Sequence, residues 1–245
     1  MDSPGFYELS VHSVPDNINT AGTMVRLAKR LGYACIAITN TSGSCKLETL
    51  SIPEGIGVLK GVELSTDNAS RLHGLVGKYI NIADIIVVRG GNEDINRAAV
   101  ENPNVDVLLN SGSSKDGGLN HILARSASDN NVSISFDIGE LIGHRGGRRV
   151  RTLSSFRKDM KLVRKYDVPF MLTANARCIY DMRAPRELMA LAGMFGMTYK
   201  EALSGLSSNP QITLSRKKHS KNYVFDGVEI VDGPSHMIKE EGDRN

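Results

Sequence analysis

The chain has 245 residues, of which 40% are hydrophobic, and this is enough for one large α/β domain or two small ones. Its net charge is only +3, and no apolar run approaches the roughly 20 residues that a membrane-spanning helix requires. The first ten residues lack the basic and apolar segments of a signal peptide, so we expect a cytoplasmic protein that does not contact a membrane. The three cysteines include no C-x-x-C pair, which argues against a disulfide framework or a zinc ribbon.

Short apolar runs rich in β-branched residues recur along the chain and predict strands that are buried on both faces of a parallel sheet. Segments with helical spacing lie between them, and the first places Met24, Leu27 and Leu31 on one apolar stripe. The predicted strands cover residues 6–12, 33–39, 57–65, 84–90, 105–111, 132–138 and 168–174. The predicted helices cover residues 19–32, 95–101, 119–128 and 152–166, with Thr152 as the N-cap of the last one.

Repeated alternation of strands and helices predicts βαβ units with right-handed crossovers, which form either a closed β/α barrel or an open doubly wound sheet. We favour a single TIM-like β/α barrel of about seven parallel strand–helix units, because no G-x-G-x-x-G motif follows the first strand. Function in such a barrel resides on the loops after the strands. We assign residues 1–214 to the barrel and 215–245 to a basic and then polar C-terminal segment that is largely disordered at its end. Residues 225–231 could add one edge strand.

Residue types that bind metals occur at the ends of four predicted strands, within ELSVHS (8–13), AITNTS (37–42), KGVELS (60–65) and LTANAR (172–177). These stretches resemble the PHP (polymerase and histidinol phosphatase) superfamily, whose β/α barrels carry a multinuclear metal site with the pattern D-L-H-x-H, T-D-H, G-x-E and S-D-A-H. His12 and Glu63 keep two of the seven ligand positions compared. The other five positions carry Ser10, Asn40, Thr41, Asn175 and Arg177.

These substitutions argue against a metal centre. A hydrolytic metal ion needs several anionic or imidazole ligands to lower the pKa of its bound water. Asparagine carries no charge, and Arg177 would place a positive charge where a ligand should be. We therefore expect no catalytic metal and interpret His12 and Glu63 as a vestigial, hydrogen-bonded pair. A metal-dependent phosphoesterase of the PHP type is the alternative.

Basic residues are concentrated in residues 143–165, which include nine lysines and arginines and one acid, a net charge of +8, whereas the rest of the chain carries −5. Such local charge favours a polyanionic partner. We expect a flexible loop at 144–151 that presents Arg145, Arg148, Arg149 and Arg151 to phosphates. On the next predicted helix, an arc of about 120° carries Arg157, Lys158, Lys161, Arg164 and Lys165. A solvated outer helix is the alternative, although this arc has no acids for i,i+4 pairs.

A second group of arginines follows the last predicted strand, within ARCIYDMRAPREL (176–188). Arg177, Arg183 and Arg186 lie close together in the sequence, and arginine presents a planar fork that matches phosphate oxygens. Asp181 could orient one of them, and Pro185 suits the first turn of a helix. With no tryptophan and 5% aromatic residues, the chain favours recognition of the backbone and shape of structured RNA over base stacking.

Residues 165–210 carry the most specific resemblance to a known family. They contain K-Y-x-V-P, T-x-A, D-x-R-x-P-R-x-L and G-M-T-x-x-E-A-L-x-x-L-S-x-x-P, and residues 95–101 and 117–127 add to the match. Over roughly residues 5–210 the chain resembles protein component 3 of ribonuclease P, the family of the archaeal and eukaryotic thirty-kilodalton subunit. Its compact length suggests an archaeal member.

The resemblance implies a subunit of the ribonucleoprotein that removes the 5′ leader from precursor tRNA. The ribonuclease P RNA holds the catalytic magnesium, so we expect no cofactor and no catalytic residue on this chain. The implied partners are that RNA, a small partner protein and the other ribonuclease P protein subunits, with precursor tRNA met indirectly. Five residues lie in the stretches that resemble the family and are candidates for RNA or partner contacts: Arg97, His121, Arg125, Arg177 and Asp181. A barrel enzyme with a phosphorylated small ligand at Arg177 is a third hypothesis.

Overall fold

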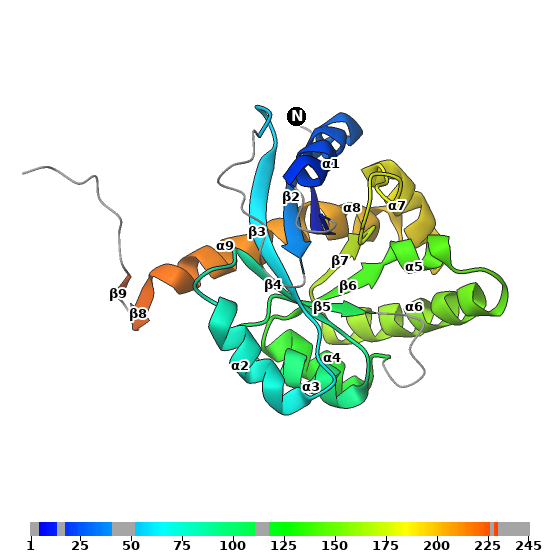
Figure 1. Cartoon of the computed structure of the whole chain (residues 1–245). Helices are drawn as coiled ribbons and strands as arrows, with labels where there is room; N and C mark the ends of the chain where they lie inside the picture. Colours follow the sequence, from blue (N-terminus) through cyan, green and yellow to red (C-terminus); the bar gives the residue numbers. More distant parts are fainter. Residues whose placement is uncertain (1–4, 14–17, 41–51, 111–117, 226–227, 230–245) are drawn as a thin grey trace, which may run out of the picture.

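Seven parallel strands, hydrogen-bonded in the order of the sequence from β1 to β7, form the centre of the molecule (Figure 1). The computed structural model describes residues 5–13, 18–40, 52–110, 118–225 and 228–229. The strands are β1 Phe6–Val11, β2 Tyr33–Asn40, β3 Gly57–Leu64, β4 Ile85–Arg89, β5 Val107–Asn110, β6 Ser133–Asp137 and β7 Phe170–Thr173. Each strand matches one predicted run, and the sheet curves into a nearly closed barrel, so the predicted fold class is confirmed.

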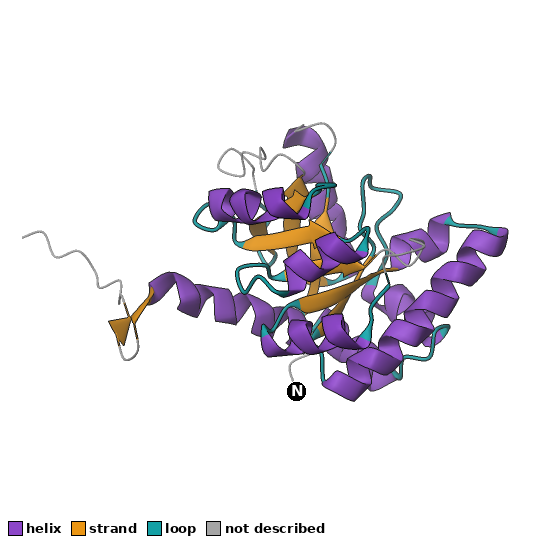
Figure 2. Ribbon diagram, turned by 90° about the horizontal axis from the view of Figure 1, so that it is seen from below, coloured by secondary structure: helices purple, strands orange, loops and turns teal. Residues whose placement is uncertain are grey.

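Helices follow the strands and cover the outside of the sheet (Figure 2). They are α1 Ile18–Leu31, α2 Ala69–Tyr79, α3 Glu93–Val100, α4 His121–Asp129, α5 Ile138–Gly143, α6 Gly146–Tyr166, α7 Pro185–Gly193, α8 Tyr199–Leu206 and α9 Ser208–Asn222. The predicted helices correspond to α1, α3, α4 and α6, and Pro185 begins α7 as expected. Sequence reasoning missed α2, because Gly74 and Gly77 weaken its helical pattern. Within the described residues, no helix is both long and apolar enough to span a membrane.

The predicted boundary of α6 was wrong. The helix begins at Gly146 rather than at Thr152, so the segment expected to be a flexible loop is mostly helical. Two adjacent glycines suggested a loop, but the residues that follow are helix formers, and the left-handed φ of 52° at Gly146 lets the chain turn from α5 into α6. Thr152 is buried inside the helix, where its hydroxyl donates to the carbonyl oxygen of Arg148 at 3.1 Å.

Two apolar layers hold the barrel together. The inner layer, inside the barrel, consists of Leu9, Ala37, Ile85, Val87, Val107, Leu109 and Met171. The outer layer lies between the strands and the helices and includes an aromatic cluster. In this cluster the ring of Phe136 on β6 packs edge-on against Phe156 of α6 at 5.3 Å and stacks on Phe195 at 5.5 Å. This cluster fixes α6 against the sheet.

Helix α9 covers the end of the barrel at which the strands begin. Leu214 packs against the inner apolar layer, and Thr213 Oγ1 lies 3.0 Å from Ser133 Oγ. Asn209 Nδ2 donates to the carbonyl oxygen of Phe170 at 2.8 Å. The helix crosses the expected boundary between residues 214 and 215 and leads to the antiparallel strands β8 (Tyr223–Phe225) and β9 (Val228–Glu229). Residues 232–245, where disorder was expected, lie outside the described residues.

Gly139, in the first turn of α5, lies against the backbone that follows β7. A Cβ atom at this position would overlap the carbonyl oxygen of Ala174. We predict that Gly139→Ala lowers the free energy of unfolding by about 2–3 kcal/mol, because the backbone of α5 or of the loop after β7 must shift. Urea unfolding followed by circular dichroism measures the change.

Gly74 in α2 is the matched control for this substitution. A Cβ atom there would meet no heavy atom within 4 Å apart from its chain neighbours and the backbone of its own helix, so Gly74→Ala should raise the free energy of unfolding by about 0.5–1 kcal/mol through helix propensity. If both substitutions changed stability by the same amount, the close approach at Gly139 would have no energetic importance.

Candidate nucleic-acid interface at the barrel mouth and helix α6

The buried carboxylate of Glu8 on β1 connects this strand to β7. It accepts hydrogen bonds from the backbone N–H groups of Ala174 at 2.8 Å and Ser10 at 3.2 Å, and from the hydroxyl of Thr173. Burial raises the pKa of Glu8 from 4.5 to about 7, although these hydrogen bonds act in the opposite direction. Sequence reasoning did not single out Glu8, and the available signal was an acidic residue inside an apolar strand.

Asn175 organises the polar floor of the barrel mouth. Its backbone is left-handed, with φ of 48°, a conformation that asparagine tolerates better than most residues. Its Nδ2 donates to Asp137 Oδ2 at 2.6 Å, and its Oδ1 accepts from His12 Nε2 at 2.8 Å and Ser10 Oγ at 3.3 Å. The side chain therefore joins β1, β6 and the loop after β7. Burial raises the pKa of Asp137 from 3.8 to about 6.

Glu63 on β3 lies between His12 and Arg89. Its Oε2 is 3.3 Å from His12 Nε2, and its Oε1 is 2.6 Å from a terminal nitrogen of Arg89 and 2.7 Å from Arg89 Nε. Burial alone would raise the pKa of Glu63, but the hydrogen bond and charge of His12 and the Arg89 guanidinium together hold it below its usual value. A cation of the chain itself thus balances this carboxylate.

The residues at the mouth do not fit a multinuclear metal site. Arg89 binds Glu63, Asn175 binds His12, and Asn40 uses its side chain on the backbone N–H and hydroxyl of Ser13. In the part of the chain that the structure describes, no three His, Cys, Asp or Glu side chains are grouped as metal ligands would be. Thr41 lies outside the described residues.

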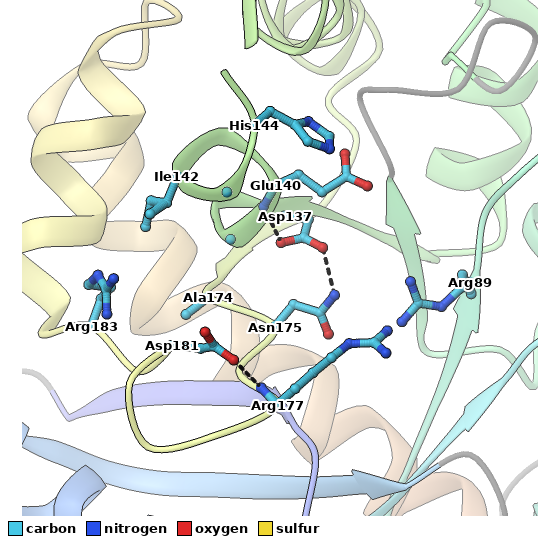
Figure 3. Close-up of a pocket in the computed structure, with 12 residues that line it drawn as sticks. Arg89, Asp137, Glu140, Ile142, His144, Ala174, Asn175, Arg177, Asp181 and Arg183 are labelled. Carbon is cyan, nitrogen blue, oxygen red and sulfur yellow. Dashed lines mark hydrogen bonds between the residues drawn. The ribbon is translucent and has the colours of Figure 1, made fainter. Parts of the chain in front are cut away.

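The ends of β4 and β6, helix α5 and the loop after β7 surround a cavity of about 430 Å³ (Figure 3). The residues that line it are Arg89, Asp137, Gly139, Glu140, Ile142, Gly143, His144, Ala174, Asn175, Arg177, Asp181 and Arg183. Three of the candidates from the sequence, Arg177, Asp181 and Arg183, are therefore brought together here. Sequence reasoning missed Arg89, whose only signal was a single arginine at the end of an apolar run.

The loop after β7 fixes its own backbone. Oδ2 of Asp181 accepts from the backbone N–H groups of Arg177 and Cys178, both at 3.1 Å, so this carboxylate orders the backbone of the loop. The Arg183 guanidinium donates to the carbonyl oxygens of Tyr180 at 2.6 Å and Met182 at 2.8 Å. Within the described residues, the exposed Arg177 guanidinium has no hydrogen-bond or ion-pair partner. Arg186 is exposed on α7, away from the cavity lining.

Helix α6 has 21 residues and presents a basic face to solvent. Its core-facing side buries Phe156, Met160 and Val163. The exposed side carries Arg151, Lys158 and Lys161 at helical spacing, and Arg145 and Arg148 lie at its beginning. None of these five cations has a hydrogen-bond or ion-pair partner among the residues that the structure describes.

Three other arginines of α6 are bound within the protein. Arg149 donates to the carbonyl oxygens of His144 at 2.7 Å and Ile142 at 3.1 Å, and Arg157 donates to that of Met194 at 2.8 Å. Arg164 forms a two-pronged ion pair with Glu201, at 2.7 and 2.9 Å, and its hydrogen bonds lower the pKa of Glu201 to about 2. These three arginines hold α6 in place. Because their guanidinium groups bind acceptors of the protein, they are less available to a phosphate than the five unpaired cations.

The remaining candidates lie on α3 and α4. Arg97 is 3.8 Å from Glu93, and Arg125 is 3.9 Å from Asp129, in exposed i,i+4 pairs that contribute little to stability. His121 is exposed at the first position of α4. None of these three residues lines the cavity.

Comparison with known proteins identifies the family. A model of the family described as RNase P subunit p30 matches residues 5–222. The chain belongs to this family. The ribonuclease P protein component 3 of Methanococcoides burtonii is 50% identical over 241 residues, which are 98% of this chain and 100% of that protein. The protein of the same name from Methanosarcina mazei is 40% identical and covers 95% of this chain and 98% of its own length.

Two solved structures have a similar fold. A chain of an archaeal ribonuclease P with mature tRNA, determined by cryo-EM, matches with a TM-score of 0.72 at 25% identity and covers 94% of this chain and 100% of its own. Histidinol phosphate phosphatase of Lactococcus lactis matches with a TM-score of 0.52 at 10% identity and covers 80% of this chain and 95% of its own. The second match shows a shared fold alone, in agreement with the resemblance to the PHP barrel.

The titration of Glu8 should appear in the pH dependence of stability. Below pH 4.5 this carboxyl group is protonated in both states, whereas between 4.5 and about 7 the folded chain keeps its proton and the unfolded chain loses it. The contribution of Glu8 to the free energy of unfolding therefore falls as pH rises through this window. We predict that Glu8→Gln, which cannot ionise, gains stability relative to the wild type by about 2–3 kcal/mol between pH 4.5 and pH 8.

Urea unfolding of both proteins across this pH range measures the difference. Glu8→Ala is the comparison variant, since it leaves the N–H groups of Ala174 and Ser10 without an acceptor and should be about 2–4 kcal/mol less stable than Glu8→Gln at every pH. If the difference in free energy of unfolding between the wild type and Glu8→Gln stayed constant with pH, the raised pKa of Glu8 would be contradicted.

Proposed function

We propose that this chain is the protein component 3 subunit of ribonuclease P and that it binds and supports the catalytic RNA of this enzyme, which removes the 5′ leader from precursor tRNA. The family match over residues 5–222 and the 50% identity to a named component 3 support the subunit assignment. The likeness to a chain of archaeal ribonuclease P supports its place within that ribonucleoprotein.

The main support for an RNA-binding role is the exposed basic face of α6. Arg151, Lys158 and Lys161, which we call the α6 stripe, are exposed and have no partner among the described residues. The stripe includes no aromatic side chain, so it offers charge for phosphates rather than a surface for stacked bases. Contacts of this kind position an RNA backbone and weaken steeply as salt increases.

We further propose that the chain has no catalytic site and binds no cofactor, and that magnesium acts at the RNA. The Arg89 guanidinium, 2.6 Å from Glu63, supplies the positive charge that a metal ion would supply in a hydrolytic barrel. The other cavity-lining arginines would repel a divalent cation. These features disfavour the alternative of a metal-dependent phosphoesterase.

The proposed partners are the ribonuclease P RNA, a small partner protein and the other protein subunits, with precursor tRNA met through the assembled enzyme. Arg97, His121 and Arg125 on α3 and α4 are candidates for one of these contacts because they are exposed and separate from the mouth. A cytoplasmic location is part of the same proposal.

Reconstitution of the holoenzyme tests the role of the α6 stripe. We predict that the triple variant R151E/K158E/K161E lowers precursor-tRNA cleavage at limiting protein by about tenfold or more, because three phosphate contacts become repulsive. The slope of log affinity for the RNA against log salt concentration should decrease in magnitude by about 2–3. Cleavage of end-labelled precursor tRNA and filter binding at several salt concentrations give the two values.

The triple variant K29E/R30E/R71E is the matched control. It changes the net charge by the same amount at exposed positions of α1 and α2, outside the proposed RNA surface. Circular dichroism checks that both variants fold. Equal losses in the two variants, or wild-type cleavage by the α6 variant, would contradict the assignment of RNA binding to this face.

Metal analysis tests the non-catalytic role. We predict that the purified chain holds no stoichiometric zinc or manganese and that, alone with either metal, it does not hydrolyse a phosphate monoester, because His12 and Glu63 are engaged by Asn175 and Arg89. Inductively coupled plasma mass spectrometry and a colorimetric phosphatase assay measure these properties. Stoichiometric metal and activity that both disappear in His12→Ala would instead favour the phosphoesterase.

A further inference from the structure

The loop after β7 carries one aromatic side chain that the fold does not use. Tyr180 is 81% exposed, more than any other large hydrophobic residue whose side chain the structure describes. Its hydroxyl has no hydrogen-bond partner in that part of the chain. Neither packing nor hydrogen bonding among the described residues therefore accounts for the position of this ring.

The backbone on both sides of Tyr180 is held in place. The N–H group of Asp181 closes a turn by donating to the carbonyl oxygen three residues earlier at 3.1 Å, and the Arg183 guanidinium donates to the carbonyl oxygen of Tyr180 at 2.6 Å. Met182 is buried in the outer apolar layer, and Ile179 packs against this layer. The ring thus projects from an ordered loop, so a ligand that binds it loses little free energy in ordering the protein.

The same loop carries the unpaired cation Arg177. Three residues of chain limit the distance between the Cα atoms of Arg177 and Tyr180 to about 11 Å. The loop also folds back on itself, because the Asp181 carboxylate accepts from the backbone N–H of Arg177 at 3.1 Å. Figure 3 shows that the Arg177 side chain extends away from Asp181 and toward Arg89. One short loop therefore offers a guanidinium for a phosphate and, close by in the chain, an exposed aromatic ring.

The surroundings of the ring favour a nucleic acid over an apolar protein surface. A hydrophobic partner needs a contiguous apolar patch. Here Met182 is buried and Ile179 is half-buried, whereas the exposed neighbours Arg177 and Asp181 are charged. An exposed aromatic ring beside an arginine is typical of surfaces that bind single-stranded nucleic acid, where bases stack on the ring and cations bind the backbone.

We propose that Tyr180 stacks on one unpaired base of an RNA strand whose phosphate binds Arg177. This inference rests on the proposed function, because the strand belongs to the RNA that the subunit binds. Stacking uses the face of a base, so the site accepts all four bases. Neighbouring bases cover these faces in a double helix, so the bound segment is a single-stranded loop, bulge or end. With no tryptophan and 5% aromatic residues, the chain offers a platform for one base rather than for a run of bases.

The absence of tryptophan from the chain makes a direct test possible, because Tyr180→Trp introduces a single fluorescent reporter at the proposed site. Titration of this full-length variant at low salt with an octamer of uridylate should give a saturable decrease in fluorescence. A self-complementary RNA duplex and inorganic polyphosphate, which carries the charge but no bases, should leave the fluorescence unchanged. Ile82→Trp is the control, since Ile82 is 50% exposed and precedes β4, at the opposite end of the barrel.

Variants without a reporter separate stacking from charge, with affinities measured by fluorescence anisotropy of a labelled octamer. Tyr180→Ala should weaken binding of the uridylate octamer by about tenfold and leave binding of polyphosphate unchanged, whereas Tyr180→Phe, which keeps the ring, should stay within about twofold of the wild type. Arg177→Ala should weaken binding of both polyanions. Arg71→Ala, on an exposed position of α2, removes the same charge elsewhere and should match the wild type.

Two results would overturn the proposal. One is equal affinity of Tyr180→Ala and the wild type for the octamer, and the other is a fluorescence decrease in Tyr180→Trp that polyphosphate or the duplex reproduces, which would mean that no base is stacked. Either result would leave the subunit assignment intact, because that assignment is measured by precursor-tRNA cleavage with the α6 variants. Wild-type cleavage by the α6 variant together with stacking at Tyr180 would contradict the proposed function instead.

Discussion

The barrel depends on one buried carboxylate at its seam. Neighbouring strands from β1 to β7 pair through parallel ladders, whereas β1 meets the segment after β7 at an isolated bridge between Val11 and Ala176. Glu8 bridges this seam because it accepts from the backbone of both sides, at Ser10 and Ala174. The position of Asn175, and with it the polar floor of the mouth, follows from this closure.

The mouth illustrates how a barrel site can keep its shape while the sign of its charge changes. Glu63 matches a metal-ligand position of the PHP pattern, yet its counter-charge is the guanidinium of Arg89, 2.6 Å away. A covalently attached cation needs no cluster of anionic ligands, and three other positions of the PHP pattern carry Ser10, Asn175 and Arg177. The result is a hydrogen-bonded surface in which a guanidinium of the chain lies against Glu63.

Much of the architecture could be predicted from the sequence, because buried parallel strands leave continuous apolar runs and the basic residues of α6 recur at helical spacing. The partners of individual side chains could not. Arg149, Arg157 and Arg164 look like their neighbours in the sequence, and only packing reveals that carbonyl oxygens and Glu201 bind them. Glu8 and Asp137 were missed for the same reason, since their contacts join residues far apart in the chain. Local glycines also misled the assignment of the start of α6.

The attachment of α6 has a thermodynamic consequence for association. Arg157 and Arg164 tie one side of the helix to the loop between α7 and α8 and to α8 itself, while Phe156 anchors it to the sheet. The spacing of Arg151, Lys158 and Lys161 is thereby set along a helix that cannot bend or rotate freely. Association with a partner that matches this spacing costs little entropy in ordering the protein backbone, so most of the conformational adjustment falls to the partner.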